Sequence, residues 1–201
     1  MKDFFNKTYQ LLFSYGANMN SDQILFRCNK PEVFSIARLP DHSVSFFGHS
    51  RRWDGGEETV ISAPGEDTWG VIYKLSFRDL IQLDSWQDVR LDGTGLYFHF
   101  PTDVLTPEGT KYPVLVYKKD ILGAQKPPSV EYLNYIIRGA TERGLPSAYI
   151  QKLWNLQACP SSYSVPLTYT FDRSLISDLS CDCDGESDQL TKVPTAIKLA
   201  H

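Results

Sequence analysis

The loop that follows the first apolar run of the sequence has residues suited to holding a small molecule. The run at 9–15 leads into Tyr15, Gly16, Ala17, Asn18 and Met19, which we call the 15–19 loop. Glycine tolerates a positive φ, so the chain can turn sharply at Gly16. The backbone N–H groups that follow can then point at a carbonyl or carboxylate oxygen. The same residues are also compatible with an ordinary tight turn that holds no ligand.

A pair of carboxylates, Glu57 and Glu58, has the chemistry for acid–base catalysis. The pair follows Gly55-Gly56 directly and begins an expected strand. Successive side chains of a strand point to opposite faces, so only one of the two should face the interior. Burial among apolar residues would raise the pKa of that carboxyl toward neutrality, which suits a general acid or base. The alternation does not say which residue faces inward, and an arrangement with both in solvent is also open.

Short strands and a few helices must position these residues. Apolar alternation and clustering predict strands at 9–15, 33–39, 43–48, 58–63, 68–75, 96–105 and 112–118. Capping residues followed by helical spacing predict a helix over 22–28, capped by Asn20 or Ser21, and helices after Ser76, after Ser129 and over 147–156. This mixture predicts an α+β fold: a small, mostly antiparallel β-barrel with flanking helices. The mouth of such a barrel can hold one small ligand.

The composition argues against several classes of protein. The chain has 201 residues, 42% of them hydrophobic, and a formal net charge of −4, which argues against nucleic-acid binding. No apolar run approaches the roughly 20 residues of a membrane helix, and the first residues do not read as a secretion signal. We therefore expect a cytoplasmic protein without membrane contact. The sequence also lacks a phosphate loop, a dinucleotide fingerprint and a metal-ligand set, so we expect no cofactor and no metal.

The end of the chain differs from the rest. We expect one domain over residues 1–160 and a C-terminal extension over residues 161–201, which packs on that domain or trails from it. The extension is rich in Ser, Thr and Asp, and it contains one expected strand at 165–171. Cys181 and Cys183 lie in an acidic part of it, without further ligands at metal-binding spacing.

A series of short motifs resembles, in order and spacing, those of the γ-glutamylcyclotransferase family. The motifs lie at 13–19 (FSYGANM), 37–39 (ARL), 53–56 (WDGG), 64–71 (PGEDTWGV), 83–84 (LD), 95–97 and 144–153 (GLPSAYIQKL). The resemblance implies the family fold and an enzyme without cofactor. In family enzymes the α-amine of a γ-glutamyl substrate attacks its own γ-carbonyl, giving 5-oxoproline and a released amine. The implied substrate-binding residues are the 15–19 loop, Tyr97 and Tyr149. Independently of the resemblance, Arg51 and Arg52 could bind a substrate carboxylate, although such a pair can also simply be exposed.

One departure from the family pattern concerns its catalytic glutamate. In the matching segment 83–89 (LDSWQDV), Gln87 stands where the family has its general base. Glutamine has nearly the shape of glutamate but no proton to exchange near neutral pH, although its amide oxygen still accepts a hydrogen bond. The candidates for a relocated base are Glu58, Glu57 and Asp88. In the family, small apolar residues take the places of Glu57 and Glu58.

Three functions are compatible with this departure. The first is a divergent family enzyme, a lyase or cyclase of secondary-metabolite biosynthesis similar to the type found in fungal natural-product pathways. The second is an active γ-glutamylcyclotransferase with a relocated carboxylate, and the third is a non-catalytic module that binds a small ligand. We expect a small-molecule substrate as partner and leave a homodimer open. A carboxylate inside the cavity, near the 15–19 loop, would favour an enzyme.

Overall fold

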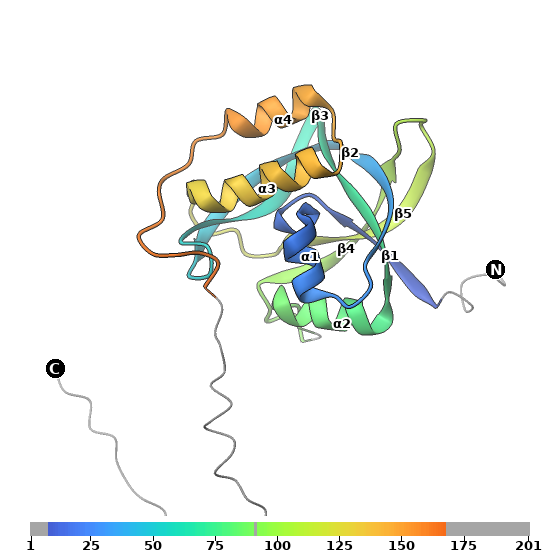
Figure 1. Ribbon diagram of the computed structural model, residues 1–201, viewed down its shortest axis with the longest axis horizontal. Coiled ribbons are helices and arrows are strands. Elements are labelled where there is room, and N and C mark those ends of the chain that lie inside the picture. The colour runs from blue at the N-terminus through green and yellow to red at the C-terminus, as the bar shows by residue number, and fades with distance from the viewer. Residues whose placement is uncertain (1–7, 91, 168–201) are drawn as a thin grey trace, which may run out of the picture. The chain divides into compact units, whose positions relative to one another are not determined.

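The computed structural model describes residues 8–90 and 92–167 (Figure 1). Its strands are β1 (Tyr9–Ser14), β2 (Glu32–Ser50), β3 (Gly55–Ser76), β4 (Tyr97–Leu105) and β5 (Lys111–Lys119). They form a closed barrel in the order β1-β3-β2-β4-β5. The pairing is antiparallel except between β1 and β5, which run parallel. The predicted α+β barrel with flanking helices is confirmed.

Helices cover this barrel on two sides. The helices are α1 (Ser21–Arg27), α2 (Phe77–Trp86), α3 (Val130–Glu142) and α4 (Ser147–Trp154), and the residues Ala17–Met19 form a 3-10 turn, η2. Figure 1 shows α3 and α4 together over one side of the barrel, and α1 and α2 on another. The predicted caps are present: Asn20, Ser76 and Ser129 each accept a hydrogen bond from a first-turn backbone N–H. α2 ends at Trp86, with Gln87 as its C-cap, and Tyr132 lies in the first turn of α3.

Two long strands replace four predicted short ones. β2 and β3 pair from Glu32 opposite Lys74 to Ser50 opposite Gly55, with a register shift between Pro40 and His42. At this bulge Asp41 has a φ of 56°, and its carboxylate accepts a hydrogen bond from the Gly65 backbone N–H at 2.9 Å. A bulge lets strands bend without ending, so the pairing continues through the gaps left between the predicted strands around residues 40 and 65. β3 also begins at Gly55, three residues before the strand predicted at 58–63.

The first residues of the predicted C-terminal extension contact the domain. The backbone N–H groups of Ser161 and Leu167 donate to a Glu131 carboxylate oxygen and to the Arg52 carbonyl, each at 2.9 Å. The strand predicted at 165–171 is not formed over 165–167. Residues 168–171, Cys181 and Cys183 lie outside the described residues, and the boundary at residue 160 stays a prediction. Within the described part of the chain, no helix has the length and apolar character to cross a membrane.

Candidate active site

The 15–19 loop leaves the end of β1 and enters the core. The Tyr15 hydroxyl donates a hydrogen bond to the Tyr117 carbonyl of β5 at 2.6 Å, which ties the loop to the strand that neighbours β1. Gly16 has a φ of −110°, so the positive φ expected there is wrong. Glycine is needed for another reason: a Cβ at this position would stand 2.9 Å from Cδ and Cγ of Glu58 and would overlap its Oε1. The loop and the start of β3 are therefore in direct contact.

Glu58 is a buried carboxylate that faces this loop. Only 8% of the Glu58 surface is exposed. Oε2 accepts a hydrogen bond from the Tyr132 hydroxyl and a longer one from the Tyr97 hydroxyl, at 3.3 Å, while Oε1 is the carboxylate oxygen nearest to Gly16. Burial raises the pKa of this carboxyl, and the hydrogen bond from Tyr132 opposes that shift only in part. Of the two predicted candidates, Glu58 is thus the one that faces the interior.

Close packing at the start of β3 directs Glu58 inward. The Gly56 N–H donates to the Pro127 carbonyl at 2.9 Å, and a Cβ on Gly55 would stand 2.8 Å from the Pro128 carbonyl carbon, so only glycines allow this approach. On α3, the Tyr132 ring stacks on the Trp53 ring, with centroids 4.3 Å apart. Aromatic packing therefore fixes the hydroxyl that holds the Glu58 carboxylate.

Glu57 has a different environment. Its carboxylate forms an ion pair with Lys119, and the two side chains are only 13% and 4% exposed. The alternative in which both glutamates lie in bulk solvent is therefore wrong. Because Lys119 already neutralises Glu57, this carboxylate is less suited than Glu58 to exchange a proton with a substrate.

Gln87 lies where two cavities meet. It is the C-cap of α2, and the bridge between Val89 and Tyr97 brings this helix end against the start of β4. A small inner cavity of about 10 Å³ lies under the 15–19 loop, and an outer cavity of about 280 Å³ opens beside it. Gln87 and Glu58 line both cavities. The inner one is otherwise lined by Phe13, Ser14, Tyr15, Gly16, Asn18 and Tyr117.

The outer cavity contains three further predicted residues. Tyr97, Arg52 and Asp88 all line it. The Arg52 guanidinium lies 4.0 Å from the centre of the Trp86 ring and donates to the Trp86 carbonyl at 2.8 Å. Asp88, with a φ of 50°, pairs with Arg90 at 2.8 Å. The outer cavity therefore combines charged groups with aromatic walls.

The structure does not bring every predicted residue to these cavities. Ala17, Met19 and Tyr149 are buried among core residues, and none of them lines the inner or the outer cavity as the described residues define them. Burial raises the pKa of the Tyr149 hydroxyl well above its usual range. These three residues support the site through packing.

Arg27 is a site residue that the sequence did not reveal. It is 7% exposed, and its guanidinium donates to Asn18 Oδ1 and, at 2.6 Å, to Gln23 Oε1. The guanidinium also lies 4.6 Å from the centre of the Trp86 ring, and burial lowers its pKa to about 10. An arginine in the last turn of a helix normally faces solvent, where it favours the helix dipole, so the sequence pattern carried no signal of this role. The sequence also carried no signal for Tyr132, because its position in α3 is that of an ordinary core residue.

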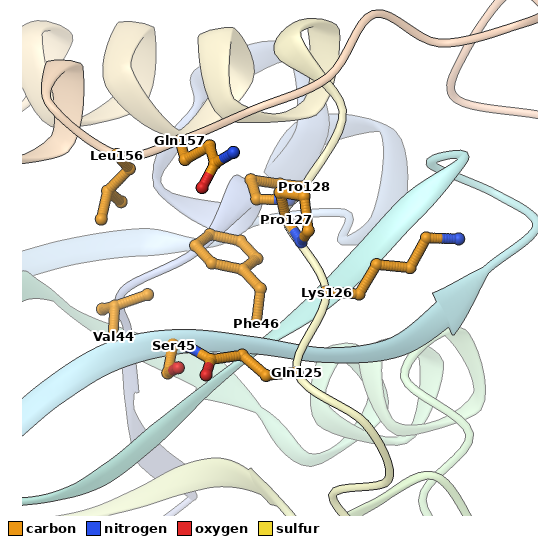
Figure 2. Close-up of a pocket in the computed structure, with 9 residues that line it drawn as sticks. All are labelled: Val44, Ser45, Phe46, Gln125, Lys126, Pro127, Pro128, Leu156 and Gln157. Atoms are coloured by element: carbon orange, nitrogen blue, oxygen red, sulfur yellow. The ribbon is translucent and has the colours of Figure 1, made fainter.

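A third hollow, of about 410 Å³, lies away from this site. Figure 2 shows it between β2, the segment 125–128 and residues 156–157, with the Phe46 ring at its centre. Its one charged lining residue, Lys126, contacts His49 Nδ1 at 2.8 Å. No group of three His, Cys, Asp or Glu side chains within residues 8–90 and 92–167 could hold a metal ion.

Comparison with known proteins agrees with this geometry. The structure is a closed barrel in which a tyrosine–glycine loop lies against a buried carboxylate. The AIG2-like family model matches residues 67–153. The bovine γ-glutamylcyclotransferase is 32% identical over 157 residues, which cover 76% of this chain and 80% of the bovine chain. The human γ-glutamylcyclotransferase is 32% identical over 158 residues, which cover 77% of this chain and 81% of the human chain. A solved structure of a γ-glutamyl cyclotransferase superposes with a TM-score of 0.73 at 32% identity, covering 78% of this chain and 93% of the other. The chain belongs to the γ-glutamylcyclotransferase family.

Proposed function

We propose that this family member is a divergent lyase or cyclase that uses Glu58 as its general acid–base group. Its substrate would be a small molecule of secondary metabolism, as in fungal natural-product pathways, and the reaction would take place in the cytoplasm. The observation that carries the proposal is the position of the Glu58 carboxylate, which lies against Gly16 and lines both cavities together with Gln87.

The environment of Glu58 suits proton transfer in both directions. Tyr132 and Tyr97 donate to Oε2, which leaves Oε1 as the oxygen that can exchange a proton with a substrate. Burial raises the pKa of the carboxyl, which makes the protonated form accessible closer to neutral pH. In a cyclisation, Glu58 would take a proton from the attacking amine and return it to the leaving group. Such a step typically contributes about 10²–10⁴-fold, and holding both reacting groups in one cavity adds to this through orientation.

Gln87 would bind rather than exchange protons. Its amide can accept a hydrogen bond from a substrate amine and donate one to a substrate carbonyl, but it has no titratable proton near neutral pH. The side chain is half-buried at the boundary of the two cavities. It would therefore orient the substrate while Glu58 carries the proton.

An enzyme explains the buried carboxylate better than a binding module does. A carboxyl group in an apolar interior costs free energy, and a site that only binds a ligand gains nothing from a raised pKa. Release of 5-oxoproline with Glu58 as a relocated base is the second candidate, supported by the names of the bovine and human relatives. A homodimer stays a prediction.

The test replaces Glu58 by glutamine. The purified chain is incubated with γ-glutamyl amides, glutathione S-conjugates and other small amino amides, and products are followed by mass spectrometry. On any substrate that the wild type converts, we expect Glu58→Gln to lower kcat by at least about 10²-fold. Glu32→Gln, at an exposed pair with Lys74, is the matched control and should leave kcat unchanged. Wild-type kcat in Glu58→Gln, with a large loss in Asp88→Asn, would assign the base to Asp88 instead.

A further inference from the structure

The Glu58 side chain lines both the inner and the outer cavity, and it lies directly beside Gly16 of the 15–19 loop. We infer that Glu58 also determines specificity: its side chain is a plug that closes the inner cavity against γ-glutamyl groups, so that substrates must react in the outer cavity. This inference deepens the proposed function and rests on it only for the claim that substrates react beside Glu58. The exclusion itself follows from the space that the side chain occupies.

The inner cavity is too small for a γ-glutamyl group. Its free volume is about 10 Å³, which is close to the minimum of about 10–15 Å³ that a single water needs. The Glu58 carboxylate occupies the space beside Gly16, so close that a Cβ on Gly16 could not be accommodated. A group with several heavy atoms could enter only if Glu58 moved out.

The plug is held in place from the side opposite Gly16. The Tyr132 and Tyr97 hydroxyls both donate to Oε2, and Tyr97 also donates to the Glu58 carbonyl at 2.8 Å. The Tyr132 ring in turn stacks on Trp53. Rotation of Glu58 away from the loop would break hydrogen bonds to a buried carboxylate, which are among the stronger ones in proteins.

The constricted inner cavity has polar groups in its wall that a ligand could contact. Ser14, which is 5% exposed, lines it, and the Ser14 Oγ has no hydrogen-bond partner among the described residues. Buried hydroxyls are nearly always satisfied, so an unsatisfied one in a cavity wall indicates room for a polar group of a ligand. Asn18 lines the same wall, and Arg27 orients its side chain. The inner cavity is therefore a constricted space with polar groups that a ligand could contact.

The plug also defines which substrates remain possible. The outer cavity of about 280 Å³ has Trp53, Trp86 and Leu96 in its walls, and Glu58 and Gln87 at its boundary with the inner cavity. The chemical class that fits is a compact molecule with a flat or apolar part against the tryptophans, polar groups that can contact Arg52 and Asp88, and one N–H or O–H group directed at Glu58. A glutamyl side chain is not required.

The experiment measures binding of γ-glutamyl-alanine by calorimetry to the wild type, Glu58→Gln and Glu58→Ala. Glutamine has nearly the volume of glutamate, so Glu58→Gln keeps the plug and removes only the charge. We expect binding to Glu58→Ala to be at least about tenfold tighter than to the other two, because a buried polar group regains a partner. Equal gains in both variants would mean that charge excludes the ligand, and no gain in a folded Glu58→Ala would mean that nothing is excluded; either result overturns the plug.

A second variant protects this test from misfolding. Glu58→Ala leaves the Tyr132 hydroxyl buried without its acceptor, so Glu58→Ala/Tyr132→Phe removes the unsatisfied group and should bind γ-glutamyl-alanine as tightly, with a higher melting temperature. Failure of the proposed function is seen separately, since it appears as undiminished turnover in Glu58→Gln, whose plug is intact.

Discussion

Glu58 occupies the space that a side chain at position 16 would need, so Gly16 and Glu58 act as one structural unit. The φ of Gly16, −110°, is open to any residue, and glycine is required only because the Glu58 carboxylate comes so near. The loop after β1 and the start of β3 are thereby coupled, although they are far apart in the sequence. A change at either position should be felt at the other.

Gly16→Ala tests this coupling. The added methyl group must displace a carboxylate that two tyrosines hold, so we expect a loss of about 1–3 kcal/mol in the free energy of unfolding, as for other overpacked sites. Glu58→Ala removes the obstructing atoms, and the loss caused by Gly16→Ala should then largely disappear in the double variant. Urea unfolding of the four proteins gives the coupling energy. Strictly additive effects would show that the two residues are independent.

The burial of Glu58 predicts a stability that falls as the pH rises. Its pKa is raised above the ordinary value of 4.5, so over a range above pH 4.5 the native state retains a proton that the unfolded chain has released. The contribution of this group is fully present below pH 4.5 and is lost as the pH rises through the native pKa, with a slope of at most about 1.4 kcal/mol per pH unit. Glu58→Gln has no such proton. The unfolding free energy of the wild type minus that of Glu58→Gln, measured up to about pH 8, should therefore decrease as the pH increases, and a constant difference would contradict the raised pKa.

Local patterns predicted the helices and their caps because these depend on neighbouring residues. Asn20, Ser76 and Ser129 each cap a helix as expected. The two long strands were not predicted, because the pairing of β2 with β3 continues through a bulge that reads locally as a turn. Tertiary pairing overrode the local signal there.

The candidate site was predictable only in part, for a similar reason. Residue order and strand alternation drew attention to the 15–19 loop and to the glutamate pair. Whether Glu57 or Glu58 faces inward depends on partners that are distant in the sequence: Lys119 pairs with Glu57, and Tyr132 holds Glu58. Arg27 and Tyr132 carry no local signal of these contacts.

Glu57 is expected to matter for stability through its ion pair. Glu57→Gln leaves the Lys119 cation, 4% exposed, without a counterion, and loss of one partner of a buried pair typically costs about 3–5 kcal/mol. Lys119→Met in the same chain should recover most of that loss. Glu32→Gln, whose pair with Lys74 is exposed, should cost less than about 1 kcal/mol. Chemical denaturation measures all four. A loss for Glu57→Gln as small as that for Glu32→Gln would mean that the pair contributes little.

Gln87→Glu tests whether the family reaction is blocked by chemistry alone or also by space. The wild type should release little or no 5-oxoproline from γ-glutamyl-alanine, because the residue at the family's catalytic position cannot exchange a proton. Gln87→Glu restores a carboxylate at nearly constant volume, yet the plug still closes the inner cavity of about 10 Å³, so we expect only a small gain.

Glu58→Ala/Gln87→Glu both opens the cavity and supplies the carboxylate. Its rate should exceed that of either single variant by about 10²-fold, the usual contribution of a general base. The rates are followed by chromatography of 5-oxoproline. A full gain in Gln87→Glu alone would show that the γ-glutamyl group enters despite Glu58, and the missing proton would then be the whole explanation for low activity.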